Sequence, residues 1–282
     1  MREELLTELG NGFFIDPEYA SQLDTLDLTS LEAFFDTSHG KQLVKPGLGI
    51  HRSRSAIALP RMDIKAYLKC YVDPPRLRQI KYWLQHRAIA PTAWYDHYNA
   101  SVLAKAGIRT PTTIAYGFEM DGWFEKRSFI LSLEVPGASL EKTLPPYCKD
   151  LSDHSRGRKK KFIAALAAFI RKFHDTGFRH RDLYLCHIFY NEPEFYLIDL
   201  TRCFIPYMLK QRYAVKDIAQ LYFSAPGSVF SSTDRMRFIL AYTGRTRLDA
   251  HSRKLARSIL TKVESMTYHN RRHGKIAPYE SL

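Results

Sequence analysis

The sequence predicts an α+β fold in two lobes, a first half built on an antiparallel sheet and a helical second half. Short strand-like segments alternate with turns across residues 41–71, and this spacing favours an antiparallel meander. Residues 161–174 instead repeat apolar side chains at helical spacing, which indicates a buried helix of the larger lobe. With 282 residues, of which 45% are hydrophobic, the chain is long enough to bury a core.

The elements of the first lobe follow in order along the chain. Residues 1–30 are expected to form a lead-in segment of short helical or irregular structure, because turn residues interrupt it. The first lobe is expected over residues 31–134. Its strands are predicted at residues 41–44, 53–59, 65–71, 112–117 and 128–134, and its helices at residues 76–87 and 92–107.

The second lobe is expected over residues 135–282. The turn formed by Val135, Pro136 and Gly137 is interpreted as a hinge between the lobes, since proline and glycine interrupt regular structure there. After this turn the sequence becomes mainly helical. Helices are predicted at residues 161–174, 215–223 and 251–266, with one strand-like segment at residues 195–200.

The amino-acid composition limits the kinds of molecule that the protein is expected to bind. A formal net charge of +13, from 42 Lys and Arg against 29 Asp and Glu, predicts attraction to polyanions without choosing among them. The sequence lacks homeodomain, zinc-finger, KH and RNP-type signatures, so no nucleic-acid partner is expected. The four cysteines form no CxxC pair, which argues against a zinc site or a disulfide framework and fits a reducing cytoplasm.

The same residues bear on location. The first residues, MREELLTELG, do not resemble a secretory signal. The longest strongly apolar run, residues 162–170, is well short of the roughly 20 residues that a membrane-spanning helix needs. We therefore expect a cytoplasmic protein whose contact with a membrane is peripheral.

One segment of the second half carries the chemistry of phosphoryl transfer. His180, Arg181 and Asp182 form an HRD triplet, His187 stands five residues after the aspartate, and Asp199 ends a strand-like YLID. Protein kinases have HRDLxxxN, with the Asp at the acceptor and the Asn on a metal ion, followed by a metal-binding Asp in DFG. The pattern predicts Asp182 as the catalytic residue and Asp199 and His187 as metal ligands, with His180 and Arg181 supporting the loop.

The first half supplies the matching cation. Lys69 ends an AYLK stretch like the VAIK strand whose lysine contacts nucleotide phosphates. That lysine needs an acidic partner on the next helix, and Asp96 is the one acidic residue between Asp73 and Glu119. A strand lysine is ordinarily just solvated, so the ordered set of motifs carries this interpretation. The sheet-rich half, followed by a helical half with these motifs, predicts a protein-kinase-like fold.

Further candidates belong to the same interpretation. Gly47 and Gly49 could form the turn that covers ATP, although the segment lacks a full GxGxxG and a plain hairpin turn is an equal alternative. Glu134 and Val135 adjoin the predicted hinge and are expected to border the cofactor. Asp217, in VKDIAQLYFSA, resembles the buried helical Asp that braces the catalytic loop of kinase-like folds, its alternative being a solvent-facing acid.

The segments FRHRDLYLCHIFY, YLIDLTR and VKDIAQLYFSA together resemble the lipopolysaccharide core kinase family, of the WaaP and InaA type. The likeness extends to KAYLKCY, AKAGIRTPTTIAYGFE and RSFILSLEVPGASLE, so it covers most of the chain from about residue 30. It implies a kinase-like fold that uses ATP and Mg²⁺ to phosphorylate a heptose or Kdo sugar of the lipopolysaccharide inner core. Asp96 departs from the Glu usual in the family, whereas His187 is the residue expected there.

The resemblance also gives the basic residues a meaning. A run from Arg156 to Lys161 is placed at the start of a predicted helix, where cations oppose the helix dipole and an anionic partner would help. A solvated charged turn is the more frequent explanation of such a run and stays open as the alternative. A second basic group comprises Arg271, Arg272, His273 and Lys275. The expected partners are the lipopolysaccharide core or lipid A precursor and the anionic inner face of the inner membrane.

Two other functions stay open at this point. A kinase of another acceptor, such as a protein, an aminoglycoside or a different glycan, would share the same catalytic core. A pseudokinase scaffold would suit the non-standard residues His187, Asp96, Leu200 and Thr201. Retention of Lys69, Asp182 and Asp199 together argues against it, because a scaffold would be free to lose at least one of them.

Overall fold

The chain divides into two compact units. The computed structural model describes residues 6–10, 12–36, 40–43, 51–60, 64–150, 152–272 and 278–280. The first unit comprises Met1–Val135 and Asp199–Cys203, and the second comprises Pro136–Ile198 and Phe204–Leu282. The short segment Asp199–Cys203 therefore belongs to the first unit although it lies far along the sequence.

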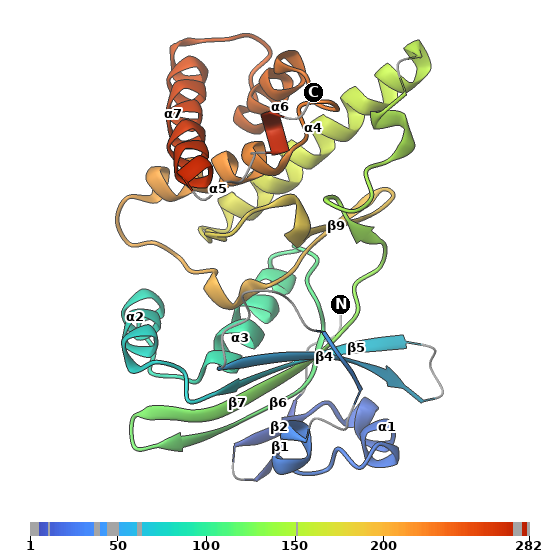
Figure 1. Cartoon of the computed structure of the whole chain (residues 1–282), viewed down its shortest axis with the longest axis vertical. Helices are drawn as coiled ribbons and strands as arrows, with labels where there is room; N and C mark the ends of the chain where they lie inside the picture. Colours follow the sequence, from blue (N-terminus) through green and yellow to red (C-terminus); the bar gives the residue numbers. More distant parts are fainter. Residues whose placement is uncertain are drawn as a thin grey trace. The chain divides into compact units, whose positions relative to one another are not determined.

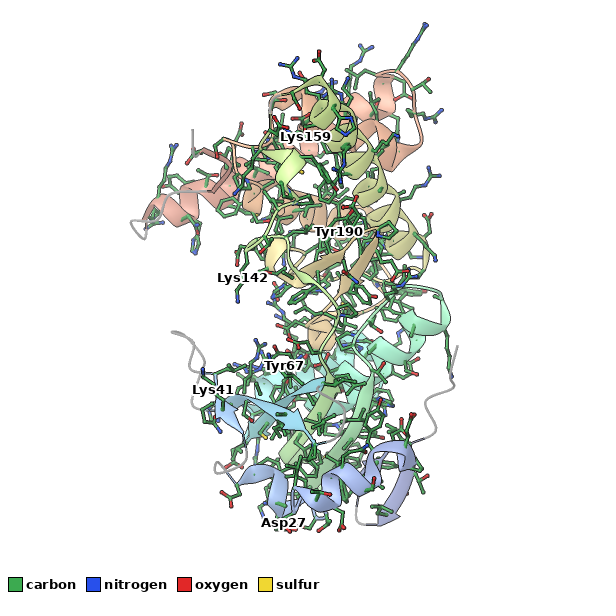
Figure 2. The ribbon with its side chains drawn as sticks, turned by 90° about the vertical axis from the view of Figure 1, so that its right-hand side faces the viewer. Asp27, Lys41, Tyr67, Lys142, Lys159 and Tyr190 are labelled. Carbon is green, nitrogen blue, oxygen red and sulfur yellow. The ribbon has the colours of Figure 1, made fainter. Side chains whose placement is uncertain are left out.

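The first unit is built on one antiparallel sheet. Its described strands follow the order β1-β2-β6-β7-β5-β4-β3, and Lys41 and Tyr67 lie on two of them (Figure 2). The predicted meander corresponds to β3, β4 and β5, which pair in sequence. The strands are β1 (Thr7–Gly10), β2 (Phe13–Ile15), β3 (Lys41–Gln42), β4 (Arg52–Leu59), β5 (Ile64–Val72), β6 (Thr113–Asp121) and β7 (Phe124–Leu133).

Different segments cover the two faces of this sheet. Because side chains alternate along a strand, Leu68 and Cys70 of β5 point to one face, where they pack with Leu23 of helix α1 (Ala20–Thr25). On the other face Ile130 packs with Ala93 of helix α3 (Thr92–Lys105). Figure 1 shows α1 and α3 on opposite sides of the sheet. Lys69, between Leu68 and Cys70, therefore points to the face that carries α3.

The opening segment differs from the sequence-based expectation of short helical or irregular structure. Phe13 and Ile15 are buried on β2, which pairs with β6, and β1 extends the sheet edge. Leu28 and Phe34 are almost fully buried in the same core. The exposed Thr7–Gly10 strand carries no alternating pattern, so local sequence could not reveal it; pairing with distant strands creates it.

A buried carboxylate anchors the beginning of α3. Glu125 on β7 accepts hydrogen bonds from the backbone N–H and the hydroxyl of Thr92, at 2.8 and 2.6 Å. Burial raises the pKa of Glu125, and hydrogen bonds from Ser128 and Thr92 oppose that rise. The side chain supplies an acceptor for an otherwise unpaired helix N-terminus, so it sets where α3, the carrier of Asp96, lies on the sheet. The neighbouring α2 spans Arg76–His86.

The second unit is mainly helical, and its helices gather together in Figure 1. A core of Ile218, Ile239, Ile259 and Val263 joins three of them. A small sheet in the order β10-β9-β8 completes the described part of the unit. Its elements are β8 (Ala138–Ser139), α4 (Asp153–Asp175), β9 (Ile188–Asn191), β10 (Glu194–Leu197), α5 (Lys210–Ser224), α6 (Ser232–Thr243) and α7 (Ala250–Arg272).

The helices of this unit depart from the sequence prediction, and α5 and α7 extend beyond the predicted residues 215–223 and 251–266. Helix α4 begins at Asp153, earlier than the predicted residue 161, because the Ser152 hydroxyl caps it by accepting from Ser155 N–H. Helix α6 was not predicted, although Ser231 and Asp234 form a capping box at its start. Among the described residues no helix combines the length and apolar character needed to cross a membrane.

Candidate active site

The structure joins Lys69 to Asp96 in the first unit. Lys69 Nζ lies 2.6 Å from Asp96 Oδ2 and 3.4 Å from Asp199 Oδ1. Asp96 has a shorter side chain than the Glu usual in the family, but its ion pair with Lys69 is not longer for that reason. Glu125 and the sheet hold α3 close to β5. Burial lowers the pKa of Lys69, but the charges of Asp96 and Asp199 outweigh burial and the net direction is upward. Lys69 is a fixed positive charge.

Helix α3 also holds the turn that follows Asp199. Asp96 accepts through Oδ1 from the Leu200 N–H at 3.1 Å. One turn further, Asn99 donates from Nδ2 to the carbonyls of Leu200 and Cys203, at 2.9 and 2.8 Å. Asp96 and Asn99 share a helix face because they are three residues apart. Sequence analysis missed Asn99. The three-residue spacing from Asp96 was the signal that could have placed Asn99 beside it.

Two arginines that sequence analysis did not consider reach Asp199. Arg52 Nη2 lies 3.2 Å from Asp199 Oδ1, and Arg54 Nη2 lies 3.0 Å from Oδ2. Both arginines are on β4, where Arg54 pairs with Lys69 in the antiparallel register. Burial lowers the pKa of Arg52, but the nearby Tyr71, Asp199 and Asp96 outweigh burial, so the pKa rises overall. Asp199 thus lies among several cations, in a left-handed backbone conformation with φ of 58°.

In the second unit the loop containing Asp182 rests on Asp217. Asp217 is fully buried on α5 and accepts from the backbone N–H groups of His180, at 2.7 Å, and Arg181, at 2.8 Å. His174 Nε2 lies 3.3 Å from the same carboxylate. Arg181 has a φ of 70°, in the left-handed region. The hydrogen bonds to Asp217 stabilise this uncommon conformation immediately before Asp182.

One face of α5 continues the support beyond Asp217. Gln220 Oε1 accepts from Leu183 N–H at 3.2 Å, and Ser224 Oγ accepts from Leu185 N–H at 3.0 Å. The three α5 residues stand three and four positions apart, which places them on one helix face. Sequence analysis missed Gln220 and Ser224, because a buried polar residue on a helix is legible only once its partner is known.

His187 and His180 bracket the same loop. His187 Nδ1 lies 2.7 Å from the Asp182 carbonyl, and because a carbonyl oxygen only accepts, Nδ1 is the donor of this hydrogen bond. The His180 ring lies 3.0 Å, through Nε2, from the Ile198 carbonyl. The two rings stack with centroids 5.6 Å apart. His187 thus orients the Asp182 backbone, and its role as a metal ligand stays a prediction.

Two other sequence candidates make contacts of their own, and two lie outside the described residues. Glu134 accepts from Tyr67 Oη at 2.8 Å, and Val135 is buried at the end of the first unit. Gly47 and Gly49 fall outside the described residues. The nucleotide-binding roles of these four residues stay predictions.

The donor chemistry around Asp199 fits a magnesium nucleotide. No group of three or more His, Cys, Asp or Glu side chains able to hold a metal occurs in the described ranges. Mg²⁺ is usually bound by one or two carboxylates, with substrate phosphates and waters completing its octahedron, so Asp199 would be the carboxylate that holds the ion. Lys69, Arg52 and Arg54 place more positive than negative charge beside it, as the phosphates require.

The basic run of α4 has a different setting from the one expected. The helix begins at Asp153, so the run from Arg156 onward lies beyond the first turn. The helix dipole acts mainly within that first turn. Lys159 (Figure 2) pairs with Asp234 of α6 at 2.9 Å. Arg158 lies over the Tyr147 ring. Lys159 is partly buried, whereas Arg156, Arg158, Lys160 and Lys161 are exposed.

The second basic group is described only in part. Arg271 pairs with Glu280 at 2.6 Å and Arg272 is exposed. His273 and Lys275 lie outside the described residues.

The fold and these clusters define a protein-kinase-like chain. A solved structure of WaaP in complex with acyl carrier protein shares the fold, with a TM-score of 0.53 and 22% sequence identity over 81% of this chain and 87% of that chain. The family of lipopolysaccharide kinases (Kdo/WaaP) matches residues 50–242. The chain belongs to this family.

Named relatives are similar over part of the chain. The lipopolysaccharide core heptose(I) kinase WaaP of Escherichia coli (strain K12) is 31% identical over 153 residues, or 50% of this chain and 56% of that protein. The kinase of the same name from Pseudomonas aeruginosa is 29% identical over 154 residues, or 51% of this chain and 56% of that protein. The chain thus spans about half the length of the curated relatives that it matches.

Proposed function

We propose that this protein is an ATP-dependent phosphotransferase that phosphorylates a sugar hydroxyl of the lipopolysaccharide inner core, a heptose or Kdo. The observation that carries the proposal is the cluster in which Lys69 Nζ lies 2.6 Å from Asp96 and 3.4 Å from Asp199. A partly buried lysine held by a helical acid, next to an aspartate whose carboxylate oxygens can bind a cation, matches the needs of phosphate and magnesium binding.

Each residue then has a defined task. Bound MgATP supplies the phosphoryl group. Lys69 balances phosphate charge, Asp96 holds Lys69, and Asp199 offers carboxylate oxygens to the metal. Asp182 orients the acceptor hydroxyl and takes its proton, and the hydrogen bonds from its loop to Asp217 keep its backbone in place.

The acceptor is proposed from the relatives. Both relatives named above are heptose(I) kinases of the lipopolysaccharide core, and the description of the family names Kdo beside WaaP. A different acceptor would use the same residues, and a pseudokinase would keep the fold without turnover. These alternatives predict different products, so the reaction itself separates them.

The decisive experiment offers acceptors to the purified protein with ATP and Mg²⁺. One acceptor is core lipopolysaccharide stripped of its heptose phosphate, and the other is Kdo-lipid A without heptose. Mass spectrometry should show one added phosphate on one of them, absent with Asp182→Asn. Phosphate transfer only to a protein or an aminoglycoside would overturn the acceptor assignment, and absence of ATP turnover would overturn the enzyme assignment. In cells, loss of the gene should remove a phosphate from the core oligosaccharide.

The proposed location is the cytoplasmic face of the inner membrane, because the acceptor is a membrane glycolipid. An exposed apolar turn before α5 supports this proposal; its exposed residues are Ile205, Tyr207, Met208 and Leu209, at 51%, 78%, 69% and 56%. Exposed Lys210 and Arg212 follow directly, and the sequence between Asp199 and Asp217 contains no acidic residue. Apolar side chains flanked by cations are typical of segments that dip into an anionic bilayer surface.

Vesicle flotation tests this location. Replacing Tyr207 and Met208 by Ser should weaken binding to vesicles of anionic phospholipid, with a smaller effect on vesicles of neutral lipid. The control is Trp123→Ser, since Trp123 is also exposed, at 68%, but lies in the β6–β7 turn of the first unit. Equal binding by wild type and the double variant would exclude this turn as the contact.

A further inference from the structure

Arg52 and Arg54 of β4 converge on a single carboxylate. They are two residues apart, so they share a face of the sheet, and the register sets Arg54 opposite Lys69 and Arg52 opposite Tyr71. Their Nη2 atoms lie 3.0 to 3.2 Å from Asp199. The Arg52 guanidinium also lies over the Tyr71 ring, 5.4 Å from its centroid. The two side chains are therefore directed to the same point as Lys69.

These guanidinium groups have more hydrogen-bonding capacity than their partners use. The Nε atoms of Arg52 and Arg54 are buried without a hydrogen-bond partner among the described residues. A buried donor left unpaired costs about 1–3 kcal/mol, and two such donors side by side indicate an acceptor-rich ligand. The side chains stay partly open to that ligand, at 26% and 27% exposure.

The net charge of this cluster indicates which kind of ligand it would bind. Three cations, Arg52, Arg54 and Lys69, face two carboxylates, Asp96 and Asp199, so this cluster carries one net positive charge. If Asp199 gives its oxygens to a divalent cation, its hydrogen bonds from both arginines are lost and the positive charge rises further. Guanidinium groups then need other oxygen acceptors, and phosphate oxygens match their planar donor geometry.

We propose that Arg52 and Arg54 bind the polyphosphate chain of the nucleotide and compete with the metal for Asp199. This inference rests on the proposed kinase function and adds two residues, Arg52 and Arg54, to the nucleotide-binding site. It makes β4 a source of side-chain contacts to the phosphates, beyond the backbone contacts of a phosphate-covering turn. Lys69, opposite Arg54, would hold the same chain from β5.

Nucleotide binding with graded phosphate number tests the proposal. Calorimetry measures the affinities of wild type, Arg52→Ala with Arg54→Ala, and Lys105→Ala for ATP, ADP and AMP with Mg²⁺. Lys105 is an exposed cation at the end of α3 and controls for loss of charge from the same unit. The double variant should lose about 100-fold or more in ATP affinity, because a charge-assisted hydrogen bond contributes roughly tenfold or more. AMP affinity and the control variant should match wild type.

The outcomes separate this inference from the function on which it rests. A wild-type protein that binds none of the three nucleotides overturns both. Tight ATP binding by wild type and double variant alike overturns the role of the arginines alone. An equal loss for ATP and AMP also overturns it, since that result marks a damaged site and not a lost phosphate contact. If the alanine variant fails to fold, Arg52→Lys with Arg54→Lys is measured, for which the ATP loss should be smaller and still exceed the AMP loss.

Discussion

The two units support their functional aspartates in opposite ways. Asp217 is fully buried on α5, and the backbone N–H groups of the loop that carries Asp182 donate short hydrogen bonds to its carboxylate. Asp199 is 20% exposed and is surrounded by the ends of long cationic side chains. The first arrangement fixes a backbone. The second can exchange partners, because lysine and arginine side chains rotate at little cost.

This difference suits the separate duties that the proposed function gives to the two units. A catalytic carboxylate needs a fixed position relative to the acceptor, and the network of α5 provides such a position. A metal-nucleotide site must release and rebind its ligand, and side-chain ion pairs of partial exposure allow that. Substitutions in each unit test this contrast.

The largest expected effect is on turnover. Asp182→Asn should lower kcat by about 1,000-fold or more, since a positioned base contributes roughly 10²–10⁴, while the Kd for ATP changes little. Asp199→Asn should weaken binding of Mg²⁺ and ATP as well. Steady-state kinetics and calorimetry on both variants provide the test, and near wild-type turnover by Asp182→Asn would remove this residue from catalysis.

The next effect is on stability. Asp217→Ala should lower the free energy of unfolding by about 3–5 kcal/mol, because His180 and Arg181 would keep buried N–H groups without an acceptor. Asp199→Ala should lower the free energy of unfolding far less, because the ion pairs that it removes are partly exposed to solvent. Urea denaturation compares the two variants, and equal losses would contradict the contrast between the units.

Acid should weaken the first unit through His97. Burial lowers the pKa of His97 from 6.5 to about 4, so the unfolded chain binds the proton first as pH falls. The stability from the neutral ring is complete above pH 6.5 and is lost as pH falls from 6.5 toward 4, by about 2 kcal/mol between pH 8 and pH 5. His97→Phe keeps the ring that stacks on Tyr116 and should reduce this loss. Unfolding curves at both pH values in the two proteins measure it; an unchanged pH dependence would contradict the assignment.

The smallest effect concerns His187. If its Nε2 is a metal ligand, His187→Asn restores an oxygen ligand and keeps substantial magnesium-dependent activity, whereas His187→Ala should lose about tenfold more and need more Mg²⁺. If its role is only to hold the Asp182 carbonyl, both variants lower thermal stability and neither changes the Mg²⁺ midpoint. Activity against Mg²⁺ concentration distinguishes the roles, and an unchanged midpoint in both variants removes His187 from the metal site.

Much of this organisation was legible in the sequence because it is encoded locally. The apolar stripe of α4, the alternation in β5 and the turn residues between strands follow periodicities of two and 3.6 residues. Lys69, Asp182 and Asp199 were found because their motifs are short and ordered along the chain. The fold class and the family followed from these signals.

Other features depended on residues far apart in sequence. Arg52 and Arg54 look like ordinary exposed strand residues until the β4–β5 register sets them beside Lys69 and the segment Asp199–Cys203 joins the first unit. Asn99 and Gln220 are polar helix residues whose partners lie more than 30 positions away. Such contacts are decided by tertiary packing, because a buried polar group is stable only where a specific distant partner meets it.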